Sequence, residues 1–170
     1  MLRLVIGRFG SPGILLLIVL TFFACVNDIK NELNVPKEIE VLIDDYVRAW
    51  TEGDTEFILS NVYGEPFTLF LEHTTIVLKS NESIRNFLDN TFLNLKSSGY
   101  DKSMINKWES FKSKGDFAIV GMNYTRFLKD GSVMGAKERS GTYILKKFFT
   151  PKSKKEYRIL SIISHNEIDS

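Results

Sequence analysis

The chain of 170 residues has few of the residues that form cross-links and metal centres. Cys25 is its single cysteine, so no disulfide can form within the chain. A metal site built on the two histidines, His73 and His165, would also need a carboxylate on a converging strand, and because the sequence offers none at close spacing we expect no metal site. Glycine-rich phosphate loops and the motifs of serine hydrolases and zinc proteases are also missing from the sequence. Motifs therefore identify no catalytic residue, and we expect no cofactor.

The chain also lacks an excess of charge of either sign. It contains 22 basic and 21 acidic residues, a net charge of +1. A nearly neutral chain lacks the electrostatic footprint of a nucleic-acid-binding protein, so we expect no nucleic-acid partner. The lysine-rich segment around Pro151 is interpreted as a solvated turn between two strands, with binding to anionic headgroups as the alternative.

The N-terminus has the pattern of an export signal. Arg3 and Arg8 precede the apolar run 14–20, which is too short to span a membrane, and Ala24 precedes Cys25. The segment 20–25, Leu-Thr-Phe-Phe-Ala-Cys, resembles a bacterial lipoprotein box, which implies that Cys25 is lipidated and begins the mature chain. We therefore expect a signal peptide over 1–24, a tether over 25–35 and an exported protein of the cell envelope, anchored to a membrane on its periplasmic or outer side. A soluble secreted protein with an ordinary cleaved signal is the alternative.

Three helices are predicted in the first part of the remaining chain. Apolar residues recur at helical spacing from Ile39 to Trp50, and Gly53 can end that helix in the left-handed conformation. We expect Trp50, at the end of this stripe, to be buried against a sheet. Asp54 can cap a shorter helix over 55–62. Ser80 can cap a third helix, which ends at Gly99.

The strands follow a different period. The segment 67–79 is rich in β-branched and aromatic residues and predicts two short strands around Glu72 and His73. After Gly99 the apolar period becomes two, with turn signals at Gly115-Asp116 and Asp130-Gly131. The four long strands predicted there cover 102–112, 116–128, 133–148 and 156–167. Helices followed by a run of strands predict an α+β domain with its helices on one face of an antiparallel sheet.

Several segments resemble one known superfamily. Tyr46–Asp54 is similar to the end of the first helix in the nuclear transport factor 2-like superfamily, which includes ketosteroid isomerases and SnoaL-like proteins. Further similar segments are Glu65-Pro66-Phe67, Thr125-Arg126 before Asp130-Gly131, Thr142–Leu145 and Tyr157-Arg158-Ile159. The resemblance implies a cystatin-like cone over 36–168, in which a strongly curved antiparallel sheet surrounds long helices in the order α-α-β-β-α-β-β-β-β. It also implies an internal pocket.

Strand alternation and the resemblance together indicate a ligand site. Met122, Tyr124 and Arg126 share one strand face, which the resemblance implies lines the cone. The complete set of candidate ligand-binding residues is Tyr46, Trp50, Met122, Tyr124, Arg126, Tyr143 and His165. An arginine and tyrosines among apolar walls suit a small apolar or amphipathic ligand with an acidic or carbonyl group. The alternative is that the aromatic side chains fill the core while Arg126 extends to the rim.

An enzymatic function is a second hypothesis. Tyr46 matches the tyrosine with which ketosteroid isomerases polarise a carbonyl, but the chain has no carboxylate in Phe67–Phe70 or Ser140–Thr142, where the resemblance implies the other two catalytic groups. A SnoaL-like isomerase, cyclase or hydrolase would need another base, such as His165 or Glu72. A third hypothesis is a homodimeric interaction module that uses the open face of the sheet.

Overall fold

The computed structural model describes residues 36–112, 115–149 and 155–165. The predicted signal peptide, the tether, Cys25 and the turn around Pro151 lie outside these residues. The elements are α2 (Lys37–Glu52), α3 (Thr55–Phe57), the π-helical turn η1 (Ile58–Val62), β1 (Tyr63–Phe70), β2 (Thr75–Leu78), α4 (Asn81–Ser97), β3 (Tyr100–Lys112), β4 (Phe117–Leu128), β5 (Arg139–Phe149) and β6 (Lys155–His165). This order is the expected one, with α3 and η1 together filling the place of the short second helix.

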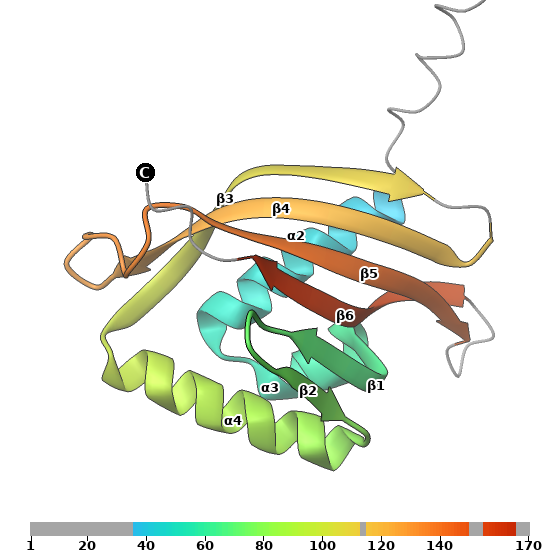
Figure 1. The fold of residues 1–170 in the computed structure, drawn as a ribbon, viewed down its shortest axis with the longest axis horizontal. Helices are drawn as coiled ribbons and strands as arrows, with labels where there is room; N and C mark the ends of the chain where they lie inside the picture. Colours follow the sequence, from blue (N-terminus) through green and yellow to red (C-terminus); the bar gives the residue numbers. More distant parts are fainter. Residues whose placement is uncertain (1–35, 113–114, 150–154, 166–170) are drawn as a thin grey trace, which may run out of the picture. The chain divides into compact units, whose positions relative to one another are not determined.

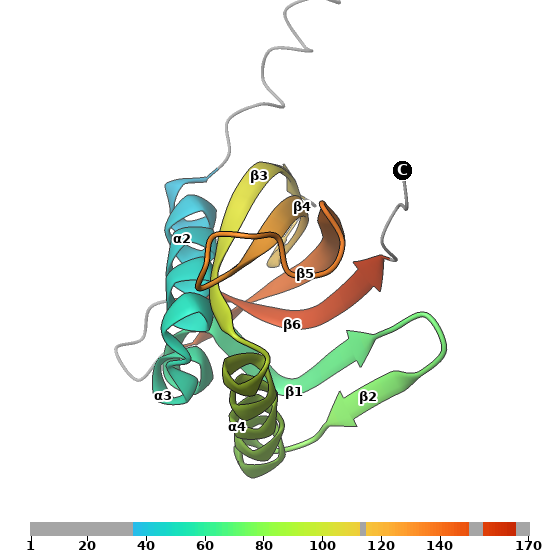
Figure 2. The same cartoon turned by 90° about the vertical axis from the view of Figure 1, so that its left-hand side faces the viewer.

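One curved sheet contains all six described strands in the order β2-β1-β6-β5-β4-β3 (Figure 1). Helix α2 lies along the inner side of the sheet, and α4 lies beside α3 and the β1–β2 hairpin (Figure 2). The predicted α+β class, with helices packed in a curved sheet, is confirmed. Strands β1 and β6 pair in parallel, which the expectation of a wholly antiparallel sheet did not include. A parallel pair requires a long crossover, and here α4 and β3–β5 connect the two strands.

The apolar stripe of α2 faces the sheet and forms the centre of the core. Its buried residues are Ile39, Leu42, Ile43, Tyr46 and Ala49. Gly53 ends the helix with φ 69°, a conformation that glycine adopts without steric strain. The predicted stripe and its end are therefore both present.

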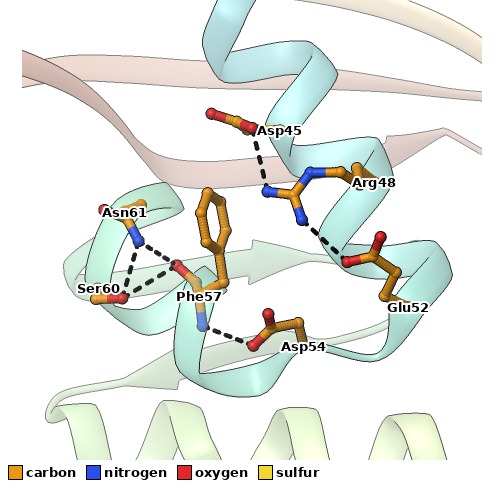
Figure 3. A network of polar contacts seen from close by, with 7 residues as sticks. All are labelled: Asp45, Arg48, Glu52, Asp54, Phe57, Ser60 and Asn61. Carbon is orange, nitrogen blue, oxygen red and sulfur yellow. Dashed lines mark hydrogen bonds and ion pairs between the residues drawn. The ribbon is translucent and has the colours of Figure 1, made fainter.

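A polar network joins the end of α2 to the next helix (Figure 3). The carboxylate of Asp54 accepts a hydrogen bond from the backbone N–H of Phe57 at 2.9 Å, which is the predicted cap. Arg48 forms ion pairs with Asp45 at 3.2 Å and Glu52 at 2.9 Å. Its guanidinium carbon lies 4.5 Å from the centre of the Phe57 ring. These contacts fix the direction in which the chain leaves α2, so that η1 and β1 begin beneath it.

The segment before β5 differs from the prediction, because the strand begins at Arg139 and not at 133. Residues 129–138 fold back against β4, where the N–H of Met134 donates to the carbonyl of Arg126 at 2.9 Å. The hydroxyl of Thr125 donates to the carbonyl of Lys137 at 2.9 Å. Hydrogen bonds to β4 therefore compete with continuation of the β5 ladder and hold this segment as a loop.

A bulge in β6 changes which side chains face inward. Leu145 pairs with Ile159, whereas the preceding residue Ile144 pairs with Ser161, so Leu160 is an extra residue in the ladder. Because the side-chain period of a strand is two, one extra residue inverts the faces of all residues that follow. Ile159 and Ile162 both face the core, and His165 faces outward.

Candidate functional site

The inner face of the sheet and α2 enclose a small cavity of about 20 Å³. Its lining residues are Tyr46, Val47, Trp50, Ser103, Met122, Tyr124, Arg126 and Tyr143. Six of the seven candidate residues therefore come together here, from α2, β4 and β5. Val47 and Ser103 were missed, although Val47 lies in the predicted apolar stripe. Whether the assembled residues bind a ligand stays a prediction.

His165 is the candidate that lies apart from the others. Its ring nitrogen Nε2 is 2.9 Å from the hydroxyl oxygen of Thr142, on the sheet face that points away from α2. The β6 bulge causes this placement, and no residue spacing in the sequence reveals a bulge. Glu72, the other candidate base, is in the exposed β1–β2 turn, where its carboxylate lies 3.3 Å from Nε2 of His73.

Closely packed aromatic rings occupy most of the interior. The ring of Tyr46 meets Tyr143 edge-on, with centroids 5.5 Å apart, and Trp50 at 6.0 Å. The indole Nε1 of Trp50 donates to the hydroxyl of Tyr63 at 3.2 Å, and Tyr63 stacks on Phe67 at 4.1 Å. Since a single water needs about 10–15 Å³, the remaining volume holds one water molecule. Aromatic side chains thus fill most of the interior, as the alternative interpretation of the sequence proposed.

Trp50 is only partly buried, which corrects the expectation that it would be enclosed by the sheet. The indole contacts Tyr46 in the core, with ring centroids 6.0 Å apart, and Phe92 of α4, with ring centroids 5.0 Å apart. The helical stripe placed Trp50 correctly on the inner side of α2. Its exposure depends on how α4 packs beside α2, which the stripe does not encode.

The buried phenols are neutral hydrogen-bonding groups. Burial raises the pKa of Tyr46 and of Tyr143 well above the usual value, and it also raises the pKa of Tyr63. For Tyr143, the positive charge of Arg126 offsets a part of this rise in pKa. At neutral pH these side chains can therefore donate a hydrogen bond to a carbonyl or carboxylate oxygen, but they do not act as bases.

Arg126 brings the positive charge of the cavity lining. Its guanidinium carbon is 5.7 Å from the centre of the Tyr124 ring, and its stem lies along apolar wall. The Nε–H is buried and has no hydrogen-bond acceptor among the residues that the structure describes. A buried donor without an acceptor is costly, so an acceptor brought by water or a ligand would stabilise this site.

The described residues of the cavity wall include no carboxylate and no imidazole. Proton abstraction at this site would have to rely on a phenol with a raised pKa, which is an unfavourable base at neutral pH. Within 36–112, 115–149 and 155–165, no group of three metal-ligating side chains occurs. In the same ranges, no helix has both the length and the apolar character that a membrane crossing requires.

The curved sheet packed around α2 places the fold in the class of cystatin-like cones. A family profile described as NTF2-like protein (DUF6841) matches residues 37–167. The chain belongs to this NTF2-like family, which agrees with the resemblance seen in the sequence. The comparison with curated proteins gives no match.

Solved structures with the same fold are distant in sequence. An NTF2-like protein from Novosphingobium aromaticivorans is 18% identical, with 89% of this chain and 92% of that chain covered and a TM-score of 0.59. The protein Aln2 from a Streptomyces species is 11% identical, with coverage of 79% and 94% and a TM-score of 0.62. A candidate ketosteroid isomerase from Shewanella frigidimarina is 10% identical, with coverage of 73% and 91% and a TM-score of 0.54. These similarities concern the fold alone.

Proposed function

We propose that this protein is an exported, lipid-anchored binding domain whose cavity holds the compact acidic or carbonyl head of a small apolar or amphipathic ligand. The observation that carries the binding proposal is that Arg126 lines the cavity and that its buried Nε–H lacks an acceptor among the described residues. A carboxylate that accepts this hydrogen bond would also neutralise the guanidinium charge. Such charge-assisted bonds are about twice as strong as bonds between neutral groups.

The neutral phenols fit the same ligand chemistry. Tyr46 and Tyr143 both lie in the cavity wall, one on α2 and one on β5, with their ring centroids 5.5 Å apart. Their raised pKa values keep the O–H donors in place at neutral pH. A bound oxygen could therefore accept from an arginine and a tyrosine together, whereas a cation would find the guanidinium repulsive.

Binding can be tested with acetate and benzoate, titrated into wild type and variants by calorimetry or NMR. We expect Arg126→Leu to fold and to lose at least tenfold in affinity, since the charge and the buried donor disappear together. Arg126→Lys keeps the charge but loses the planar fork, so its loss should be smaller. Tyr46→Phe should also lower the affinity by less than Arg126→Leu does.

The matched control is Lys102→Leu, which removes one positive charge from an exposed position on β3, outside the cavity. Its affinities should equal those of wild type. Anion affinities that Arg126→Leu leaves unchanged would show that the arginine is structural and would refute this binding site.

The proposed anchoring depends on Cys25, which lies outside the described residues. We expect Cys25→Ser to release the protein from the membrane fraction or to block its processing, because the thiol is the proposed site of lipid attachment. Membrane fractionation with a labelled full-length chain measures this. A wild-type protein that already fractionates as soluble would contradict the anchor.

A second candidate function is self-association through the outer face of the sheet. One row of paired residues, which we call the outer row, crosses all six strands and consists of Phe111, Ile119, Ile144, Ser161, Thr68 and Val77. Phe111 is 60% exposed, Ile119 42% and Val77 52%. Glu109 and Lys107 flank this row with opposite charges, so two copies related by a two-fold axis would present complementary charges to each other.

Analytical ultracentrifugation tests this second candidate. We expect a homodimer that Ile119→Glu converts to monomer, because a carboxylate would be buried within the interface. Leu93→Glu is the matched control, since Leu93 is 66% exposed but lies on α4 and not on the sheet. A wild-type monomer at all accessible concentrations would refute dimerisation.

A further inference from the structure

Trp50 separates two hollows of very different size. On its inner side is the cavity of about 20 Å³, and on its outer side is a groove of about 530 Å³ between the end of α2, helix α4 and the start of β3. The indole belongs to the walls of both. The apolar part of the groove comes from Trp50, Phe92, Leu93, Leu95 and Tyr100. Lys96, Lys129, Asp89 and Asp101 are among its polar residues.

Resting on the proposed function, we propose that the indole of Trp50 is a movable partition between these hollows. The ligand enters through the groove, displaces the indole, and places its anionic head beside Arg126 while its apolar body stays against Phe92. The site therefore takes an elongated amphipathic carboxylate and not merely a small anion.

The size of the inner cavity makes a movement necessary. Room for one water molecule cannot hold even acetate, so at least one wall residue must shift before any ligand enters. The groove, in contrast, lies within the range of about 300–1,000 Å³ that is usual for small-molecule sites. Removing the shared wall would join the two spaces into one site.

Trp50 is partly exposed, as are Val47, Ser103, Tyr124 and Arg126, and among these cavity-wall residues it is the one that also lines the groove. Tyr46, Met122 and Tyr143 are 7%, 3% and 2% exposed and lie within the core. Trp50 occupies the last turn of α2, three residues before the left-handed Gly53. One hydrogen bond to Tyr63 and ring-edge contacts with Tyr46 and Phe92 hold the indole.

The two hollows also approach each other along β3. The hydroxyl oxygen of Tyr100, in the groove wall, is 2.8 Å from that of Ser103, in the cavity wall. Thr51, beside Trp50 and also in the groove wall, accepts from the N–H of Ser103 at 3.4 Å. The indole of Trp50 and these hydrogen-bonded residues therefore separate the groove from the cavity.

The first experiment compares acetate with 4-phenylbutyrate, whose phenyl group can reach the groove. We expect 4-phenylbutyrate to bind wild type at least tenfold more tightly. Phe92→Ala removes a ring that lines the groove but not the cavity, although it also contacts Trp50, and it should weaken 4-phenylbutyrate at least fivefold and acetate at most twofold. Arg126→Leu should weaken both. Equal affinities for the two acids, or an equal effect of Phe92→Ala on both, would show that the groove is not part of the binding site. Either result would overturn this inference but not the proposed function.

The second experiment measures the partition itself by stopped-flow association of 4-phenylbutyrate. Trp50→Ala removes the wall, and Tyr63→Phe removes the hydroxyl that accepts the indole's hydrogen bond and that also bonds with Tyr46. We therefore expect faster association in both, at least threefold in Tyr63→Phe. Tyr157→Phe is the matched control, a buried tyrosine in neither hollow, and should not change the rate. Unchanged rates in Tyr63→Phe would overturn the partition. If wild type binds neither acid, the proposed function fails and this inference fails with it.

Discussion

At the scale of single residues, Phe67 shows how the core is stabilised. Its side chain has no exposed surface, and its ring stacks on Tyr63 with an interplanar angle of 12°. Closely packed interiors collapse only partly around a deleted ring, so truncation removes both the burial and the contacts. Phe149, in contrast, is 75% exposed.

We therefore expect Phe67→Ala to lower the free energy of unfolding by about 3–5 kcal/mol. Phe149→Ala, which deletes the same ring from an exposed position, should lower it by clearly less, about 1 kcal/mol at most. Urea unfolding followed by circular dichroism measures both. A loss below about 1 kcal/mol for Phe67→Ala would mean that the core around Phe67 is not packed as described.

At the scale of elements, the start of α4 has a local cause. The hydroxyl of Ser80 accepts from the N–H of Ser83 at 3.2 Å, and the hydroxyl of Ser83 accepts from the N–H of Ser80 at 3.0 Å. This reciprocal pair satisfies backbone donors that the first turn of a helix leaves without partners. Helix α4 in turn forms one wall of the groove, so the cap helps to position the groove.

Ser80→Ala should reduce the free energy of unfolding by about 1 kcal/mol through loss of this cap. Asn90→Ala, at an exposed position in the middle of the same helix, should be neutral or slightly stabilising because alanine has the higher helix propensity. Urea unfolding compares the two variants. Equal effects would show that the capping hydrogen bonds do not set the start of α4.

The same scale shows how local patterns predicted the elements. The stripe Ile39–Trp50, the caps Asp54 and Ser80, and the glycine turns depend on contacts between near neighbours in sequence, and the structure has all of them. The start of β5 depends on Thr125 and on the carbonyl of Arg126, which belong to another strand. A prediction from the period of 133–148 alone could not include that competition.

At the scale of the whole molecule, Tyr46, Tyr63 and Tyr143 join three elements, since they come from α2, β1 and β5 and meet in one cluster. Burial raises the pKa of each phenol. A group whose pKa is raised in the folded state contributes stability that is complete below its unfolded pKa, here about 10, and is lost as the pH rises above it.

The domain should therefore lose stability above about pH 10, by up to about 1.4 kcal/mol per pH unit for each of these tyrosines. Urea unfolding between pH 8 and pH 11 measures this slope. Tyr143→Phe should reduce this slope by up to about 1.4 kcal/mol per pH unit, which corresponds to one proton. The substitution of an exposed lysine, such as Lys102→Gln, should leave the slope unchanged. An identical slope in Tyr143→Phe would contradict the burial of that phenol.

The candidate site was predicted in part for a physical reason. Alternation along β4 and the period of α2 put Tyr46, Trp50, Met122 and Arg126 on inward faces, and regular geometry in both elements preserved those faces. His165 was placed on the inner side as well, but the extra residue Leu160 inverts the end of β6. Tyr63 was missed because it precedes the segment in which the first strand was predicted.

The sequence by itself determined the order of the elements, their caps and turns, and the faces of α2 and β4, because these follow from backbone preferences and from side chains a few residues apart. Only the tertiary structure decided the parallel pairing of β1 with β6, the bulge at Leu160 and the loop before β5. It also decided how much space the aromatic cluster leaves and that Trp50 lies between cavity and groove. Those properties depend on how distant segments pack and share hydrogen bonds, and a close-packed interior is a property of all its neighbours together.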